Sequence, residues 1–181
     1  MIRLKAINPT EATGKTKELF NAIEDKLGMV PNMMRTMGNS SAVLEGYLNF
    51  SGALSHGALN ARTGELIALA VAESNACNYC LAAHSYIGEK LVKIDTDSLE
   101  SARSGKSNDA KTEAILQFSK TLVSKGGLVN DAEVTAAKNA GLTEAEIAEV
   151  VAHVALNILT NYFNNTANTA IDFPEVVSLQ A

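Results

Sequence analysis

The scarcity of proline constrains the fold of this chain more than any other feature of its sequence. The chain of 181 residues contains three, and Pro9 and Pro174 lie near its two ends. Between Pro31 and Pro174 no proline interrupts helical hydrogen bonding. Ala, Leu, Glu and Lys are abundant, and β-branched residues seldom alternate with polar ones. The sequence therefore predicts an all-α fold.

Capping residues and glycines divide the chain into expected helices. The first should follow Pro9, with Thr10 as its N-cap, and end at Gly28. The connections are short and none resembles a linker, so residues 1–181 are predicted to form one domain. The first helix should bury Leu19, Phe20, Ile23 and Leu27. A short helix is expected after Pro31 and a longer one after Ser40 or Ser41. The remaining helices are expected over 62–73, from the cysteines to Val92, over 95–101, from Asn108 or Asp109 to Gly126, over 131–139, and from the capping box at Thr143 as far as Ala170.

Composition argues against several classes of protein. Hydrophobic residues make up 46% of the chain and charged residues 19%, which is typical of a globular protein. The net charge is -5, no basic run occurs and Trp is absent, so we expect no nucleic-acid partner. No apolar stretch is long enough for a signal peptide or a membrane span, so we expect no membrane association and a cytoplasmic location. In that reducing compartment, a cysteine pair is more often catalytic or metal-binding than a structural disulfide.

Both cysteines stand in one short segment, E-S-N-A-C-N-Y-C-L-A-A-H. Cys77 and Cys80 are three positions apart, and on a helix this spacing places their Cα atoms about 5 Å apart, within disulfide range. If Asn75 or Ala76 caps that helix, its positive end favours a thiolate. His84, one turn after Cys80, is close enough to exchange a proton with it. A second thiol within reach traps a sulfenic acid as a reversible disulfide, so the segment predicts dithiol redox chemistry.

Two other interpretations of the cysteines are open. A zinc site needs four ligands and the segment offers three, so His56 or His153 would have to supply the fourth. Two inert buried cysteines are also possible, because free cysteine is a common core residue. Cysteines that only fill the core would not tend to combine the three-residue spacing with a nearby histidine. We therefore expect a redox pair with neither a metal nor a cofactor.

Glu65 is a further candidate. On the expected helix it shares a face with Ala68, Leu69 and Ala72, which places its carboxylate on an apolar stripe. It is either a first-turn residue favoured by the helix dipole or a partly buried carboxylate that acts as a base or orients His84. Periodicity alone does not separate these interpretations.

The last helix carries polar residues on an otherwise apolar sequence. His153 lies among valines, and we interpret it as a core or interface histidine. Several amides follow it at helical spacing, and buried amides need hydrogen-bond partners. Either a subunit interface, which we prefer, or the cysteine-containing loop could supply those partners. The amides are Asn157, Asn161, Asn164, Asn165 and Asn168.

The segment R-T-G-E-L-I-A-L-A-V-A-E-S-N-A-C-N-Y-C-L-A-A-H resembles the signature of the carboxymuconolactone decarboxylase superfamily, in the branch of alkyl hydroperoxidase D-like, peroxidase-related proteins. The stretches L-G-M-V-P-N-M-M-R-T-M at 27–37 and N-Y-F-N-N-T-A-N-T-A-I-D-F-P at 161–174 are similar to the same branch. The resemblance implies a compact multi-helix domain of the alkyl hydroperoxidase D-like type that assembles into homo-oligomers, trimers or hexamers.

The resemblance also implies a thiol peroxidase that reduces a hydroperoxide and is regenerated by an external dithiol, lipoyl- or thioredoxin-like. By position, Cys80 would attack the peroxide, Cys77 would resolve the product, and His84 and Glu65 would form the proton relay. The better-studied members have a histidine where this chain has Tyr79. A phenol, with an ordinary pKa of about 10, can donate a hydrogen bond but does not readily take a proton at neutral pH.

Two alternatives to the peroxidase stay open at this point. One is a redox-sensing or structural oligomer in which the CxxC pair switches state slowly. The other is an enzyme of the carboxymuconolactone decarboxylase type that uses His84 and Glu65 as acid and base. Members of the family that act as true lactone decarboxylases generally lack the cysteine pair, so its presence favours the redox branch.

Overall fold

The structure is a computed structural model that describes residues 1–179, and in that part of the chain all regular secondary structure is helical. The predicted all-α fold is confirmed. No helix within residues 1–179 is both long enough and apolar enough to cross a membrane. In chain order the helices are α1 (Gly14–Leu27), α2 (Asn32–Met37), α3 (Ser41–Leu54), α4 (Ala61–Ser74), α5 (Asn78–Lys90), α6 (Thr96–Arg103), α7 (Ala110–Lys125), α8 (Asp131–Asn139) and α9 (Glu144–Ala167).

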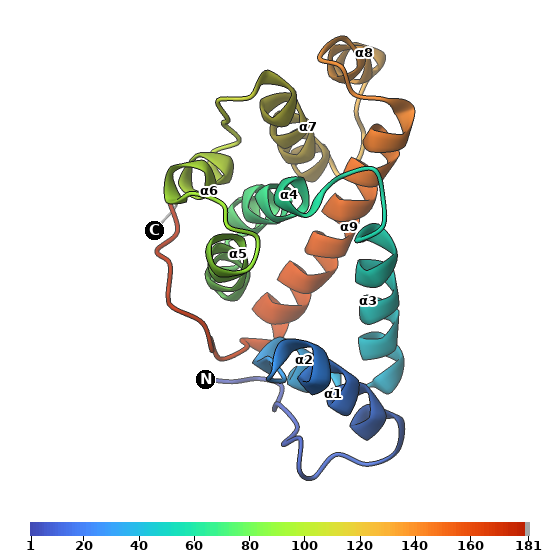
Figure 1. Cartoon of the computed structure of the whole chain (residues 1–181), viewed down its shortest axis with the longest axis vertical. Coiled ribbons are helices and arrows are strands. Elements are labelled where there is room, and N and C mark those ends of the chain that lie inside the picture. The colour runs from blue at the N-terminus through green and yellow to red at the C-terminus, as the bar shows by residue number, and fades with distance from the viewer. Residues whose placement is uncertain (180–181) are drawn as a thin grey trace.

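The helix α4 lies at the centre of the molecule, where it packs against α5, α6, α7 and α9 (Figure 1). Every residue from Leu66 to Glu73 is buried. A helix that is apolar on nearly all sides is stable only when other helices surround it. The core therefore forms around the helix that also carries Glu65, and α5, with the cysteines, packs directly on it.

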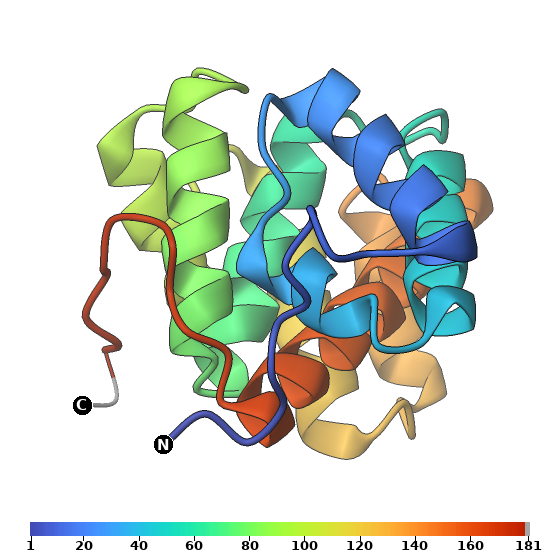
Figure 2. The same cartoon turned by 90° about the horizontal axis from the view of Figure 1, so that it is seen from below.

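The segment before α1 and the segment from α9 to residue 179 are both bound to the helical body. The N-terminal segment lies against the C-terminal end of α9, where the backbone N–H of Arg3 donates to the carbonyl of Ala167 at 2.9 Å (Figure 2). The segment after α9 returns past α5 to α6, where Arg103 Nη2 donates to the carbonyl of Val177. Arg103 also forms an ion pair with Glu73 at 2.9 Å, and both side chains are buried.

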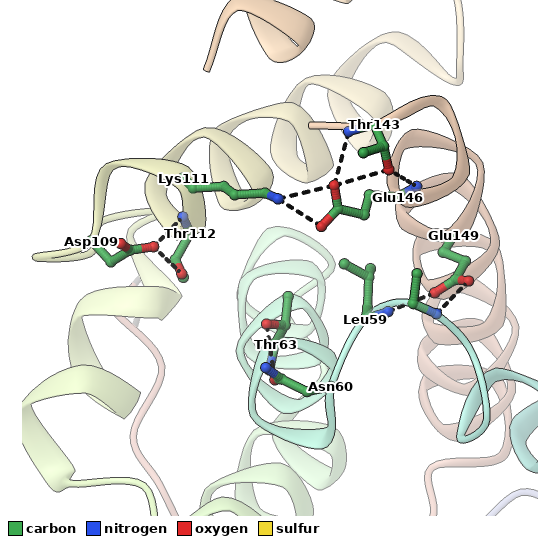
Figure 3. A network of polar contacts seen from close by, with 10 residues as sticks. Leu59, Asn60, Thr63, Asp109, Lys111, Thr112, Thr143, Glu146 and Glu149 are labelled. Carbon is green, nitrogen blue, oxygen red and sulfur yellow. Dashed lines mark hydrogen bonds and ion pairs between the residues drawn. The ribbon is translucent and has the colours of Figure 1, made fainter. Parts of the chain in front are cut away.

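Polar side chains fix the starts of α4, α7 and α9 (Figure 3). At α9, Thr143 and Glu146 form the predicted capping box, with the Glu146 carboxylate accepting from the Thr143 N–H at 2.8 Å. Lys111 Nζ of α7 donates to the same carboxylate at 2.7 Å. This bond to Lys111 and the N–H of Thr143 hold the pKa of Glu146 at about 2. Asp109, one of the two predicted candidates, caps α7.

The first helix differs in part from its prediction. Phe20 and Ile23 are buried as expected, but Leu27 is exposed in the last turn. The helix begins after Thr13 and not after Thr10. The physical reason is a local turn, because the backbone N–H of Thr10 bonds to the side chain of the preceding Asn8.

The last helix is shorter than predicted. It ends at Ala167, before the expected Ala170, because Asn168 adopts a left-handed conformation with φ 49° and its N–H donates to the carbonyl of Asn164. Asparagine is one of the few residues that takes this conformation readily, and it therefore stops the helix as glycine would.

Candidate active site

Cys77 and Cys80 are bonded as a disulfide at the start of α5, with their Cα atoms 5.3 Å apart. Cys77 itself is the N-cap of the helix, and its Sγ accepts from the backbone N–H of Cys80 at 3.3 Å. The expected caps, Asn75 and Ala76, were wrong by one or two residues. Asn75 is the C-cap of α4, and Ala76 has a positive φ of 48°, so both are used in the reversal between the two helices.

Glu65 of α4 and His84 of α5 face one another across the contact between these helices. The Glu65 Oε2 lies 2.8 Å from the His84 Nδ1, and both side chains are mostly buried, at 19% and 23% exposed. Of the two interpretations of Glu65, the one in which it orients His84 agrees with this contact. A carboxylate on one imidazole nitrogen fixes which nitrogen carries the proton and leaves the other for chemistry. His84 follows Cys80 by one turn of the same helix.

The loop before α4 is held by α9. The Glu149 carboxylate accepts from the backbone N–H groups of Ala58 and Leu59 at 2.7 and 2.8 Å (Figure 3). The side chain of Asn60 then caps α4 by accepting from the N–H of Thr63. These bonds fix where α4 begins and therefore where its glutamate lies relative to α5.

Two residues outside the predicted proton relay, Tyr47 and His153, lie close enough to Glu65 to feel its charge. Burial, with the charge of Glu65 as a lesser cause, raises the pKa of Tyr47 to about 12. Burial lowers the pKa of His153, against the opposing charges of Glu149 and Glu65. His153 lies against α4, since a Cβ at Gly64 would be 3.2 Å from its Cε1. The interpretation of His153 as a core histidine agrees with this packing, although its Nε2 is buried with no partner within residues 1–179.

Tyr79, which stands between the cysteines, bonds to α2. Its hydroxyl accepts from the backbone N–H of Met33 at 3.1 Å, and its ring packs edge-on against Phe173 with the centroids 5.9 Å apart. Burial raises the pKa of its phenol, and the nearby charge of Asp172 acts in the same direction. Tyr79 is therefore a neutral structural side chain that joins α5 to α2 and to the segment after α9.

Three of the amides of α9 contact the cysteine-containing segment, in agreement with the second of the two interpretations of them. Asn161 Oδ1 accepts from Asn75 Nδ2 at 3.0 Å, and Asn165 Nδ2 donates to the carbonyl of Asn75 at 2.9 Å. Asn164 Nδ2 lies 3.4 Å from the Sγ of Cys80 and donates to it. Helical spacing predicted that these amides share a face, but not which segment that face contacts.

The resemblance to the carboxymuconolactone decarboxylase superfamily is confirmed by comparison with known proteins. Residues 41–91, which comprise α3, α4 and α5 with both cysteines, match the Carboxymuconolactone decarboxylase family. No curated protein matches the chain in sequence.

Solved structures share the fold over nearly the whole chain. A structure of the alkylhydroperoxidase AhpD core, a peroxidase-related protein from Ralstonia eutropha JMP134, is 22% identical with a TM-score of 0.83, covering 94% of this chain and 92% of that one. A peroxidase-related protein from Silicibacter sp. TM1040 is 21% identical with a TM-score of 0.79, covering 92% and 91%. The debrominase Bmp8 is 17% identical with a TM-score of 0.77, covering 93% and 91%. The predicted alkyl hydroperoxidase D-like fold is therefore confirmed.

Proposed function

We propose that this chain is a thiol-dependent peroxidase that reduces hydroperoxides through a dithiol–disulfide cycle. The observation that carries the proposal is the pairing of Cys77 with Cys80 at a helix start, beside a Glu65–His84 contact on the same two helices. In the proposed roles, Cys80 is the nucleophile, Cys77 resolves the product, and His84 with Glu65 transfers protons.

The reaction begins from the reduced pair. The Cys80 thiolate attacks the outer oxygen of the hydroperoxide, the O–O bond breaks, and the departing oxygen takes a proton and leaves as an alcohol or water. Cys80 is then a sulfenic acid. The thiol of Cys77 attacks that sulfur, the S–O bond breaks, water leaves, and the disulfide forms. One hydroperoxide is reduced by two electrons and the two thiols are oxidised by two.

An external dithiol closes the cycle by exchange with the disulfide and is itself oxidised. We propose a lipoyl- or thioredoxin-like reductant in the cytoplasm, acting on a homo-oligomer of this chain. Cys77 is 0% exposed and Cys80 3%. The reductant must therefore reach the pair through Cys80, or after α5 has moved, and exchange is expected to be slower than peroxide reduction.

Two cysteine variants test the proposal. We expect Cys80→Ser to abolish peroxide-dependent oxidation of a dithiol, and Cys77→Ser to consume one equivalent of peroxide and then stop. Thiol titration before and after stoichiometric peroxide, followed by peptide mapping, should locate the new linkage between the two cysteines. Normal turnover by the Cys80→Ser protein would refute the proposal.

The same experiments separate the alternatives. A pair that oxidises readily but turns over negligibly in steady state indicates a redox sensor or a structural oligomer. Activity that survives replacement of both cysteines indicates acid–base chemistry of the decarboxylase type by His84 and Glu65.

The similarity in fold to a debrominase adds one assay. That debrominase has also been solved, as a variant in which one cysteine is replaced by alanine, in complex with 2,3,4-tribromopyrrole. If the present protein released bromide from this compound with oxidation of the dithiol, and did not turn over peroxide, the cysteine cycle would stand and the substrate class would change.

A further inference from the structure

Each sulfur of the cysteine pair has a hydrogen-bond donor of its own, and the two donors come from different helices. The Sγ of Cys77 accepts from the backbone N–H of Cys80 at 3.3 Å, so one of the free N–H groups at the start of α5 serves Cys77. The Sγ of Cys80 accepts from the side chain of Asn164 in α9 at 3.4 Å. The stabilisation that a helix start offers to a thiolate therefore reaches the resolving sulfur, and the proposed nucleophile depends on a side chain.

Asn164 is not explained as a structural amide. Its side chain is buried, at 2% exposed, and its Oδ1 has no partner within residues 1–179. A buried amide that holds two segments together usually has both of its ends paired. Its neighbours Asn161 and Asn165 already tie α9 to Asn75, so this connection does not need Asn164. The hydrogen bond that its side chain makes within the described residues is the one to Cys80.

The chemistry of the amide fits an anionic sulfur. The NH₂ end is a donor and can face a thiolate, whereas the carbonyl end would repel it. Hydrogen bonds to a charged partner are stronger than those between neutral groups, and removing one favours the protonated form. A donor inside the protein is also more effective than one in water, because the surroundings screen it less.

We propose that Asn164 is a catalytic residue whose amide N–H holds the Cys80 thiolate and keeps it ionised for attack on the substrate. This inference rests on the proposed function, in which Cys80 is the nucleophile. It is nevertheless testable without peroxide, since the ionisation of a thiol is measured by its rate of alkylation.

The experiment follows alkylation of Cys80 by iodoacetamide as a function of pH, in a Cys77→Ser background. We expect Asn164→Leu, which keeps a similar volume, to raise the pH midpoint of alkylation by about one pH unit, which is about a tenfold loss of thiolate below the midpoint. Asn164→Asp should raise it further, because a carboxylate repels the thiolate. The Asp variant, which is polar and close in shape, carries the test if the Leu variant fails to fold.

Asn157→Leu is the matched control. Asn157 is buried on the same helix, and its Nδ2 donates to the carbonyl of His153 within that helix. This variant should leave the midpoint unchanged. A midpoint that does not move in the Asn164 variants, or that moves as much in the control, would overturn the inference.

The outcome does not depend on the proposed activity. A raised midpoint with no peroxide turnover in the parent protein would keep Asn164 as the sulfur donor and reject the peroxidase. Turnover in the parent with an unmoved midpoint would keep the peroxidase and reject the role of Asn164.

Discussion

Neutralising Glu146 is expected to destabilise the protein by removing the ion pair that joins α7 to α9. The carboxylate accepts from Lys111 at 2.7 and 3.0 Å and closes the capping box with Thr143 at 2.8 Å. The variant Glu146→Gln keeps the size of the side chain and an oxygen for the N–H of Thr143, and removes the charge. It therefore isolates the charge of Glu146 from its shape.

The expected loss of folding stability in Glu146→Gln follows from the pKa of Glu146. The group titrates at about 2 in the folded protein against an ordinary 4.5. At about 1.4 kcal/mol per pH unit, this difference corresponds to at most about 3 kcal/mol of folding stability at neutral pH. Lys111 is 41% exposed, so solvent screens part of the interaction. We expect a loss of about 2 kcal/mol, which for a chain of this length lowers Tm by about 4–8 °C.

The stabilisation that Glu146 contributes decreases as the pH is lowered. Because the folded protein holds this carboxyl ionised, the stabilisation is complete above pH 4.5 and is lost as the pH falls from 4.5 towards 2. Urea unfolding of the parent and Glu146→Gln proteins at pH 7, 5, 4 and 3 measures this loss of stabilisation. The difference between the two proteins should be constant from pH 7 to pH 5 and narrow with each step below.

Glu144→Gln is the control for this experiment. Glu144 also pairs with a lysine, Lys138, at 2.9 Å, but its side chain is 86% exposed. Its replacement should change the unfolding midpoint little. Equal losses in the Glu144 and Glu146 variants, or a Glu146 difference that persists unchanged at pH 3, would show that the reasoning from pKa to stability is wrong.

Two further stability predictions concern the ion pair of Arg103 with Glu73 and the glycines Gly46 and Gly64. Arg103→Ala removes the cation that pairs with the buried Glu73 and leaves that carboxylate with its hydrogen bonds from Ser178 and Leu179. We expect the free energy of unfolding in urea at pH 7 to fall by about 3 kcal/mol. Gly46→Ala places a methyl group in open space on a helix and should raise stability by about 0.5–1 kcal/mol, whereas Gly64→Ala meets His153 Cε1 at 3.2 Å and should gain less or lose stability in the same measurement.

The parts of the fold that could be predicted from the sequence are those set by residues close together in the chain. The helix over 131–139 was predicted with the bounds that the structure shows. The capping box at Thr143 was predicted because its two partners stand three residues apart in the sequence. Thr10 failed as a cap because a threonine can serve a turn as well as a helix start, and composition does not separate the two. Cys77 failed to be predicted as a cap because cysteine is not among the residues that commonly cap helices.

In the candidate site, too, the residues that could be predicted are those close together in the sequence. Glu65, Cys77, Cys80 and His84 lie within one stretch of two helices, so their spacing alone indicated that they could act together. Which face of α9 meets the cysteine-containing loop is decided by the packing of α4 between α5 and α9, which no local pattern records. The same limit applies to Tyr47, whose position in α3 gave no signal that it would lie near Glu65.

The two sulfurs differ because one is stabilised by its own helix and the other by a residue of α9. A CxxC pair on a helix is asymmetric, because its first cysteine receives the N–H of the second, and helix geometry alone therefore stabilises Cys77 more than Cys80. If only α5 acted, the more readily ionised sulfur would be Cys77, and the roles of the two cysteines would be the reverse of those proposed. The bond from Asn164 acts in the opposite sense, on Cys80 alone. The assignment of the nucleophile thus depends on a residue of α9, and comparing the alkylation midpoints of the two single-cysteine proteins with Asn164 present and replaced would show which contribution is larger.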